Sequence, residues 1–330
     1  IRMAAGFGEA SIKHDKERYE HKYEYCDLLI TGSGPSGLAS AYAAAKNGAR
    51  VILAEDKPRF GGSLLTSDVN IGNQTGVEWT EKIIAELKSM PNVTVKNRSQ
   101  VFGYYDHNML VMSERISDHL PKTQKYLPKQ RLWYIRANEV LISSGSIERP
   151  LVFGNNDTPG VMLSSAAKEY MKVYGVLVGK KPLIFTNNDS GYETAIEFKK
   201  NGVNPIILDT RSNPSSDIIT EAKNLNIEIK FSYVVVAAKG YKKVKSADIA
   251  KISDDKKELF NIENIECDCI CVSGFWTPSI HLASQSGNKS KFNEKIDAFV
   301  PDKSKQQENT IGSANGIFTL EETIKDAFDK

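Results

Sequence analysis

The hydrophobic positions near the start of the chain fall into a strand, helix, strand order. Residues 26–31 form a short apolar run that is typical of a buried strand. Residues 38–47 are rich in alanine and predict a helix, which Gly48 ends. Residues 50–54 form a second apolar run. Two buried strands joined by a helix predict a βαβ unit in a parallel sheet.

The turn between the first strand and the helix is Gly32-Ser33-Gly34-Pro35-Ser36-Gly37. In such a turn the first glycine allows a tight bend, the second lets the backbone approach a pyrophosphate, and the third packs helix against strand. The pyrophosphate lies on N–H groups at the start of the helix. Glu55 ends the second strand, where a carboxylate can accept hydrogen bonds from the adenosine ribose. Together these features favour a dinucleotide site over a glycine-rich turn without a ligand.

The same order of elements occurs again further along the chain. Strand, helix and strand are predicted over residues 181–186, 192–201 and 205–209. The turn between them, Thr186-Asn187-Asn188-Asp189-Ser190-Gly191, keeps one glycine, and Asp189 would set a carboxylate against incoming phosphates. We therefore expect an inserted Rossmann-like domain that has lost dinucleotide binding.

Weaker patterns complete the predicted fold. They predict a helix over 78–90, strands over 93–95 and 101–106, an antiparallel pair over 131–144 and a loop over 298–309. We expect Ser144-Gly145 to return the chain to the first sheet beside a bound cofactor. We expect Gly312-Ser313-Ala314 to close the sheet over the same cofactor. The adjacent Gly61 and Gly62 let a loop pass close to the cofactor.

These elements predict an α/β fold of the FAD/NAD(P)-binding Rossmann-like class, with helices on a parallel sheet and an antiparallel crossover. The predicted parts are an N-terminal linker at 1–22, a discontinuous dinucleotide-binding domain at 23–159 and 266–330, and the inserted, degenerate domain at 160–265. Because the chain begins with Ile1 and a polar stretch, we expect it to belong to a longer polypeptide.

The composition excludes several classes of function. A net charge of +2 and 25% charged residues give no indication of a nucleic-acid partner. No apolar stretch is long enough to span a bilayer, and no secretory signal is visible, so we expect a cytoplasmic protein without a membrane partner.

The residues that commonly carry chemistry show no catalytic or metal-binding pattern. Cys267, Cys269 and Cys271 alternate along a strand-like run, and Cys26 opens the first strand. Zinc sites prefer longer spacings, so we expect small buried side chains rather than metal ligands. None of the five histidines has metal spacing. We expect neither a metal nor a catalytic side chain in this chain.

The layout resembles the flavoproteins with two dinucleotide-binding domains, as in the disulfide reductase class. In that class the last motif carries Gly-Asp, whose carboxylate binds the ribityl chain of the flavin. This chain has Gly312-Ser313 there, which argues against a flavin in the first site.

A closer resemblance rests on longer blocks. Residues 101–108, 146–153 and 185–190 look like the α subunit of heterotetrameric sarcosine oxidase. Residues 131–133 and 314–318 fit the same pattern. The α subunit of that family is longer at both ends, with an upstream ferredoxin-like region and a downstream folate domain related to aminomethyltransferases.

The resemblance implies a specific function. The site in this chain would hold NAD rather than FAD, within an enzyme that oxidatively demethylates sarcosine to glycine with O2. The β, γ and δ subunits would be its partners, with FAD in the β subunit and covalent FMN between α and β. The methylene group would pass to tetrahydrofolate in the downstream domain.

The predicted site combines the motif with residues carried over from the family. The turn contributes Gly32, Gly34, Pro35 and Gly37, and the flanking runs contribute Gly62, Ser144, Gly145 and Gly312. By resemblance, the further NAD contacts are Ser36, Glu55, Asp56, Lys57, Ser63, Phe102, Ser313 and Ala314, with Phe102 beside the adenine.

Two other hypotheses remain open at the level of sequence. The chain could be a self-contained flavoprotein with FAD in the first site and NAD(P)H in the second, but the degenerate second turn argues against it. It could also be a scaffold with a vestigial site, but the intact glycines and Glu55 argue against that.

Overall fold

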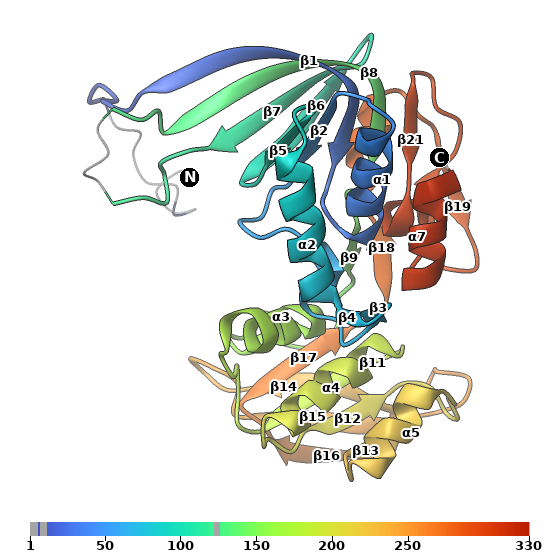
Figure 1. Ribbon diagram of the computed structural model, residues 1–330. Helices are drawn as coiled ribbons and strands as arrows, with labels where there is room; N and C mark the ends of the chain where they lie inside the picture. The colour runs from blue at the N-terminus through green and yellow to red at the C-terminus, as the bar shows by residue number, and fades with distance from the viewer. Residues whose placement is uncertain (1–5, 7–11, 122–125, 330) are drawn as a thin grey trace.

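A computed structural model describes residue 6, residues 12–121 and residues 126–329. The described chain forms two bodies, each built on its own sheet (Figure 1). Among these residues, no helix has the length and apolar character that crossing a bilayer requires.

The first body is built on a sheet of seven strands. Its path is β5-β2-β1-β8-β7-β6, and β21 pairs with β8 off this path. The strands are β1 (Tyr19–Thr31), β2 (Val51–Ala54), β5 (Val93–Lys96), β6 (Ser99–Tyr105), β7 (Met109–Arg115), β8 (Gln130–Ile142) and β21 (Glu308–Thr310). β5, β2, β1, β8 and β21 are parallel, whereas β6 and β7 add antiparallel pairs.

The longer helices of this body are α1 (Pro35–Lys46), α2 (Gly76–Ser89) and α7 (Leu320–Asp329). Pro35 occupies the first turn of α1, where its missing N–H costs nothing. A capping box formed by Thr75 and Glu78 starts α2. The buried core between α1 and the sheet includes Leu38, Ile30 and Leu53. This packing fixes the start of α1 at the end of β1.

The second body has a parallel sheet in the order β10-β17-β11-β12-β13. Its strands are β10 (Val161–Leu163), β11 (Pro182–Thr186), β12 (Ile206–Asp209), β13 (Glu228–Phe231) and β17 (Cys269–Ser273). The helices that share one buried core with this sheet are α3 (Ser164–Tyr174), α4 (Ser190–Lys200) and α5 (Asp217–Asn224). A second buried core joins it to an antiparallel sheet of β14 (Tyr233–Lys239), β15 (Ser246–Ile252) and β16 (Leu259–Glu266).

Short elements complete the chain. β9 (Ser146–Glu148) and β18 (Trp276–Pro278) form an antiparallel pair where the chain passes between the two bodies (Figure 1). The others are β3 (Asn70–Ile71), β4 (Gln74–Thr75), α6 (His281–Gln285), β19 (Ser290–Asn293), β20 (Ala298–Pro301) and the 3₁₀ turns η1 (Gly62–Leu65) and η2 (Gly312–Asn315).

Two predicted elements differ from the structure. Residues 131–144 do not form an antiparallel pair, because β8 is one long strand between β1 and β7. Residues 298–309 are not a loop, since they contain β20 and the start of β21. Polar residues interrupt the apolar runs of both segments. Whether they form strands therefore depends on pairing with neighbouring strands, which the sequence pattern does not show.

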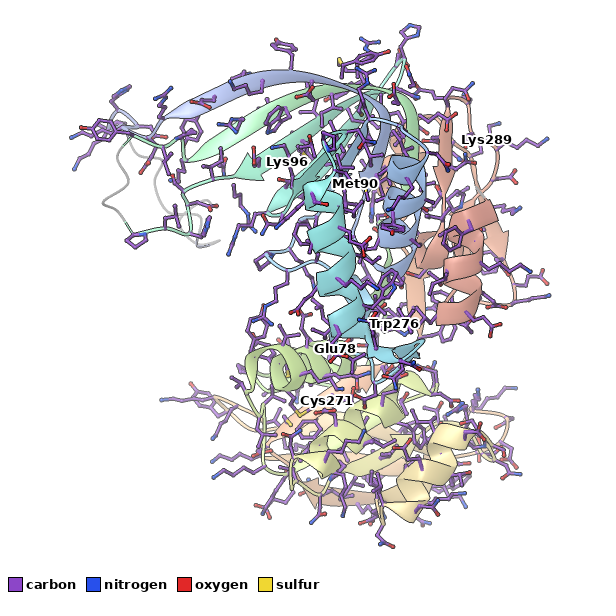
Figure 2. All side chains as sticks on the ribbon, viewed as in Figure 1. Glu78, Met90, Lys96, Cys271, Trp276 and Lys289 are labelled. Carbon is purple, nitrogen blue, oxygen red and sulfur yellow. The ribbon has the colours of Figure 1, made fainter. Side chains whose placement is uncertain are left out.

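The predicted boundary at residue 266 falls before β17, yet this strand pairs with β10 and β11 of the second sheet. The 1–22 linker likewise overlaps β1, which begins at Tyr19. The fully buried Cys269 and Cys271 face the helix side of β17, in the part of the second body where Figure 2 labels Cys271.

Candidate dinucleotide site

The first glycine-rich turn is closely packed where β1 leads into α1. A Cβ on Gly32, which has φ +103°, would overlap the carbonyl oxygen of Ser143. A Cβ on Gly37 would overlap the carbonyl oxygen of Gly32. The hydroxyl of Ser143 donates to the Gly32 carbonyl at 2.7 Å. These two glycines are required because the start of α1 lies directly against the ends of β1 and β8.

The N-terminus of α1 is open for a ligand. No side chain caps it, and no acidic residue lies in its first turn. A Cβ on Gly34, the N-cap residue, would have no atom within 4 Å. A helix of 12 residues with uncapped N–H groups favours an anion at this end. The structure therefore has a cradle that a pyrophosphate fits.

Glu55 lies buried beside this cradle, with 6% of its surface exposed. Its Oε2 accepts hydrogen bonds from the N–H of Ser33 at 2.9 Å and from the Ser33 hydroxyl at 2.5 Å. Its Oε1 accepts from the N–H of Lys57 at 3.0 Å. Burial raises the pKa of Glu55, as does the Asp56 side chain, whereas the donors on Ser33 and Lys57 oppose this rise.

The loop after β2 lies against the turn. The N–H of Gly61 donates to the Ser33 carbonyl at 3.0 Å. A Cβ on Gly62 would lie 2.9 Å from the Cα of Gly34. Both Gly61 and Gly62 have positive φ. Ser63 follows in η1. The loop thus contacts the turn directly, whereas its passage close to a cofactor stays a prediction.

The end of the chain closes the other side of the turn. A Cβ on Gly312 would lie 2.6 Å from Oγ of Ser36, and a Cβ on Gly145 would lie 3.9 Å from Oγ of Ser313. The N–H of Gly312 donates to the carboxylate of Asp326 on α7 at 2.9 Å. Segments around residues 36, 145 and 312 therefore meet, as the sequence predicts, and Ala314 is buried.

Other predicted site residues make different contacts. The ammonium of Lys57 contacts both carboxylate oxygens of Glu169 on α3, each at 3.0 Å. The Ser144 hydroxyl donates to the Ser279 carbonyl at 2.7 Å. Phe102 is 45% exposed on β6. Asp56 is exposed and accepts at its carbonyl from Arg115. Their contacts with a cofactor remain predictions.

The structure also adds residues that the sequence-based list omits. Ser33 binds Glu55, Ser143 contacts two of the glycines, and Asp326 binds Gly312. The small residues at the end of β8 indicate that this strand approaches the turn closely. They do not show which of its serines contacts the turn. No sequence signal connects Asp326 to a glycine earlier in the chain.

The second turn is occupied by its own side chains. Oδ1 of Asn188 accepts from the N–H of Ser190 at 2.9 Å, at the start of α4. Nδ2 of Asn188 donates to the Ser273 carbonyl at 3.0 Å. The carboxylate of Asp189 pairs with Arg211 at 2.8 Å, and Arg211 also binds the buried Asp209. A phosphate here would meet the Asp189 carboxylate and an N–H that is already bonded.

The two bodies meet near these turns. Trp276 lies at the junction, where Figure 2 labels it, and its indole N–H donates to the Ser190 hydroxyl at 2.9 Å. The buried Glu148 accepts from the N–H of Ser165 at 2.7 Å, and burial raises its pKa. These bonds attach the starts of α3 and α4 to the connecting strands.

Comparison with known families agrees with this geometry. The sequence profile of pyridine nucleotide-disulphide oxidoreductases matches residues 26–308, which span both bodies. This chain belongs to that family. Its members share the FAD/NAD(P)-binding Rossmann-like fold, which supports binding of a flavin or nicotinamide dinucleotide by this chain. The chain has no C-x-x-C pair, and its four cysteines are buried and free.

Named relatives confirm the resemblance to sarcosine oxidase. The chain is 38% identical over 301 residues to sarcosine oxidase subunit alpha of Rhizobium meliloti (strain 1021), covering 91% of this chain and 29% of that protein. It is 33% identical over 320 residues to the same subunit of Corynebacterium sp. (strain P-1), covering 96% and 33%. The chain thus spans about a third of the length of these relatives.

Solved structures confirm the fold class. L-proline dehydrogenase from P. horikoshii superposes with a TM-score of 0.68 at 20% identity, over 93% of this chain and 54% of that chain. Thioredoxin reductase from T. acidophilum superposes with a TM-score of 0.68 at 17% identity, over 92% and 95%. At this level of identity the likeness concerns the fold alone.

Proposed function

We propose that this chain is the NAD-binding part of the α subunit of a multisubunit sarcosine oxidase. The observation that carries the proposal is the uncapped start of α1 beside the buried Glu55, in a chain similar to these α subunits over nearly its whole length. The carboxylate favours a ribose with free hydroxyls and repels a 2′-phosphate, which supports NAD over NADP. Ser313 lacks the carboxylate that would bind a flavin ribityl chain, which supports NAD over FAD.

The roles of individual residues follow from their contacts. The N–H groups at the start of α1 would hold the pyrophosphate, Glu55 the adenosine ribose, and the loops at Gly62 and Ser313 would enclose the ligand. Bound NAD would supply a hydride-accepting nicotinamide. The Ser33 hydroxyl lies beside the Glu55 carboxylate, but both groups are buried and bound to each other within the turn. We therefore assign binding, rather than catalysis, to this chain.

The finer chemistry belongs to the same proposal. Oxidation of sarcosine to glycine with O2 would take place at FAD on the β subunit, with FMN between α and β. The methylene group would pass to tetrahydrofolate, as part of cytoplasmic one-carbon metabolism. The γ and δ subunits would complete the complex. The names of the relatives, each an alpha subunit, support the existence of partner chains.

A second candidate is a self-contained oxidoreductase with FAD in the first site and NAD(P)H in the second. The family match across both bodies favours it, as does the fold shared with thioredoxin reductase. The side chains of Asn188 and Asp189 in the second turn count against it, because they occupy the place of a second dinucleotide.

The test is to identify the nucleotide released from the purified complex. We expect denaturation to release NAD in equal molar amount to this chain, identified by mass and absorbance. In a Glu55→Arg variant we expect NAD retention to fall by at least about tenfold, since a charged hydrogen bond is lost. FAD released from this chain would favour the second candidate, and a site without any nucleotide would favour a scaffold.

A further inference from the structure

Ser33, the residue between the first two glycines of the turn, binds Glu55 twice. Its N–H and its hydroxyl both donate to Oε2 of the carboxylate, at 2.9 and 2.5 Å. Ser33 is fully buried. The N–H of Gly61 lies 3.3 Å from the Ser33 hydroxyl and 3.0 Å from the Ser33 carbonyl, which fixes the serine from the other side. The orientation of the Glu55 carboxylate is therefore set from within the turn.

The hydrogen bonds occupy the two oxygens of the Glu55 carboxylate to different extents. An ionised carboxylate has about four acceptor positions, two on each oxygen. The two donors of Ser33 fill Oε2, and the N–H of Lys57 takes one position on Oε1 at 3.0 Å. At most one acceptor position on Oε1 is left for a ligand, because the Asp56 side chain also lies within hydrogen-bonding reach of this carboxylate. Two ribose hydroxyls cannot both bind this carboxylate without displacing a protein donor.

We propose that Ser33 is a positioning residue that directs Oε1 of Glu55 toward a single hydroxyl of the adenosine ribose. The inference rests on the proposed function, because it takes NAD as the ligand of the first turn. It adds a residue whose hydroxyl acts through Glu55 rather than by touching the nucleotide.

Ser33 also supports the charge of Glu55. Burial raises the pKa of this carboxyl, and the nearby Asp56 carboxylate acts in the same direction. The neighbouring cations have other partners: Lys57 pairs with Glu169, Lys96 pairs with Glu114, and Arg115 donates to the carbonyl of Asp56. The ionised form thus depends on the hydrogen bonds of Ser33 and Lys57. Removing the Ser33 hydroxyl raises the pKa of Glu55 further.

The experiment compares NAD binding by the purified complex, stripped of nucleotide, with that by a Ser33→Ala variant across pH 5 to 8. We expect the variant to bind about tenfold more weakly at pH 8, since a hydrogen bond to a charged group is lost. The deficit grows as the pH falls, because protonated Glu55 accepts poorly. Ser40→Ala is the matched control, since Ser40 is buried on α1 but donates to the Ala327 carbonyl.

Two further measurements separate positioning from a structural role. In a Glu55→Gln background, Ser33→Ala should have little further effect, and the pH dependence should disappear. Two analogues of NAD lack either the 2′-hydroxyl or the 3′-hydroxyl of the adenosine ribose. The analogue without the hydroxyl that binds Oε1 should bind weakly, and the other should bind normally. Equal losses for both analogues, or an unchanged pH profile in Ser33→Ala, would overturn the inference. If the unaltered complex binds no NAD at all, the proposed function fails instead.

Discussion

The two turns of this chain use the same scaffold in opposite ways. In both, a parallel strand leads through a tight turn into a helix that packs on its own sheet. In the first turn the helix start is uncapped, and Gly34 faces open space. In the second, Asn188 binds the N–H of Ser190, and Asp189 pairs with Arg211.

The difference shows what a dinucleotide site needs beyond its fold. The βαβ architecture supplies a helix N-terminus with orphan N–H groups, which must find a partner. Where no side chain caps these groups, as at α1, they are available to a ligand phosphate. With an asparagine two residues before the helix, as at Asn188, the partner is the protein itself. A few turn residues therefore decide between a binding site and a structural copy.

The largest effect is expected from Gly37→Ala in the first turn. The added methyl would overlap the Gly32 carbonyl oxygen, which cannot move because Ser143 binds it. Overpacking of this kind costs about 3 kcal/mol. Urea denaturation should show a loss of this size in the free energy of unfolding, and an unchanged midpoint would contradict the packing described here.

Gly34→Ala is the matched variant, because its methyl meets no atom within 4 Å. It should keep the stability of the protein while placing a methyl in the space where we propose that the pyrophosphate binds. We expect nucleotide affinity to fall with the melting temperature of the ligand-free protein unchanged. Equal stability losses in both variants would show that the cradle at Gly34 is not open.

The second turn can be tested with Asn188→Ala. This buried side chain bonds both Ser190 and Ser273, so its removal should cost about 1 to 3 kcal/mol of unfolding free energy. Asn204→Ala, which removes an exposed amide bonded to Lys199, should cost little. We expect no gain of nucleotide binding, since Asp189 remains. NAD binding in the second body of Asn188→Ala would contradict the inference that the second turn cannot bind a dinucleotide.

The smallest effect is expected where the two bodies meet. Asp68 of the first body pairs with Lys172 and Lys200 of the second. Although burial acts to raise it, these two lysines hold the pKa of Asp68 at about 2. The folded pKa lies below the unfolded value, so the pairs stabilise the fold above pH 4 and stop doing so as the pH falls toward 2.

Asp68→Asn should therefore lower the unfolding free energy at pH 7 by at most about 1 kcal/mol, because the Asp68 carboxylate is more than half exposed and its charge is screened by solvent. The difference should shrink in high salt and vanish near pH 2. Asp106→Asn, an exposed carboxylate elsewhere, is the control. A loss that persists at pH 2 would mean that Asp68 acts by packing rather than by charge.

The sequence by itself determined the first βαβ unit, its turn and the acid at its end. These depend on local rules: an apolar run predicts a buried strand, a glycine predicts a tight bend, and a strand end positions Glu55. The meeting of the segments around Ser36, Gly145 and Gly312 was also predictable, since each pairs small residues with a strand end.

Only the tertiary structure decided the rest. It placed β17 in the second sheet, made residues 130–142 one strand and turned the Lys57 side chain toward Glu169. It also showed that Ser143 rather than Ser144 lies against the glycines, and that Ser33 binds Glu55. Each of these is a contact between residues distant in sequence. Such contacts depend on how strands align and which side chain faces inward, and no local pattern encodes that choice.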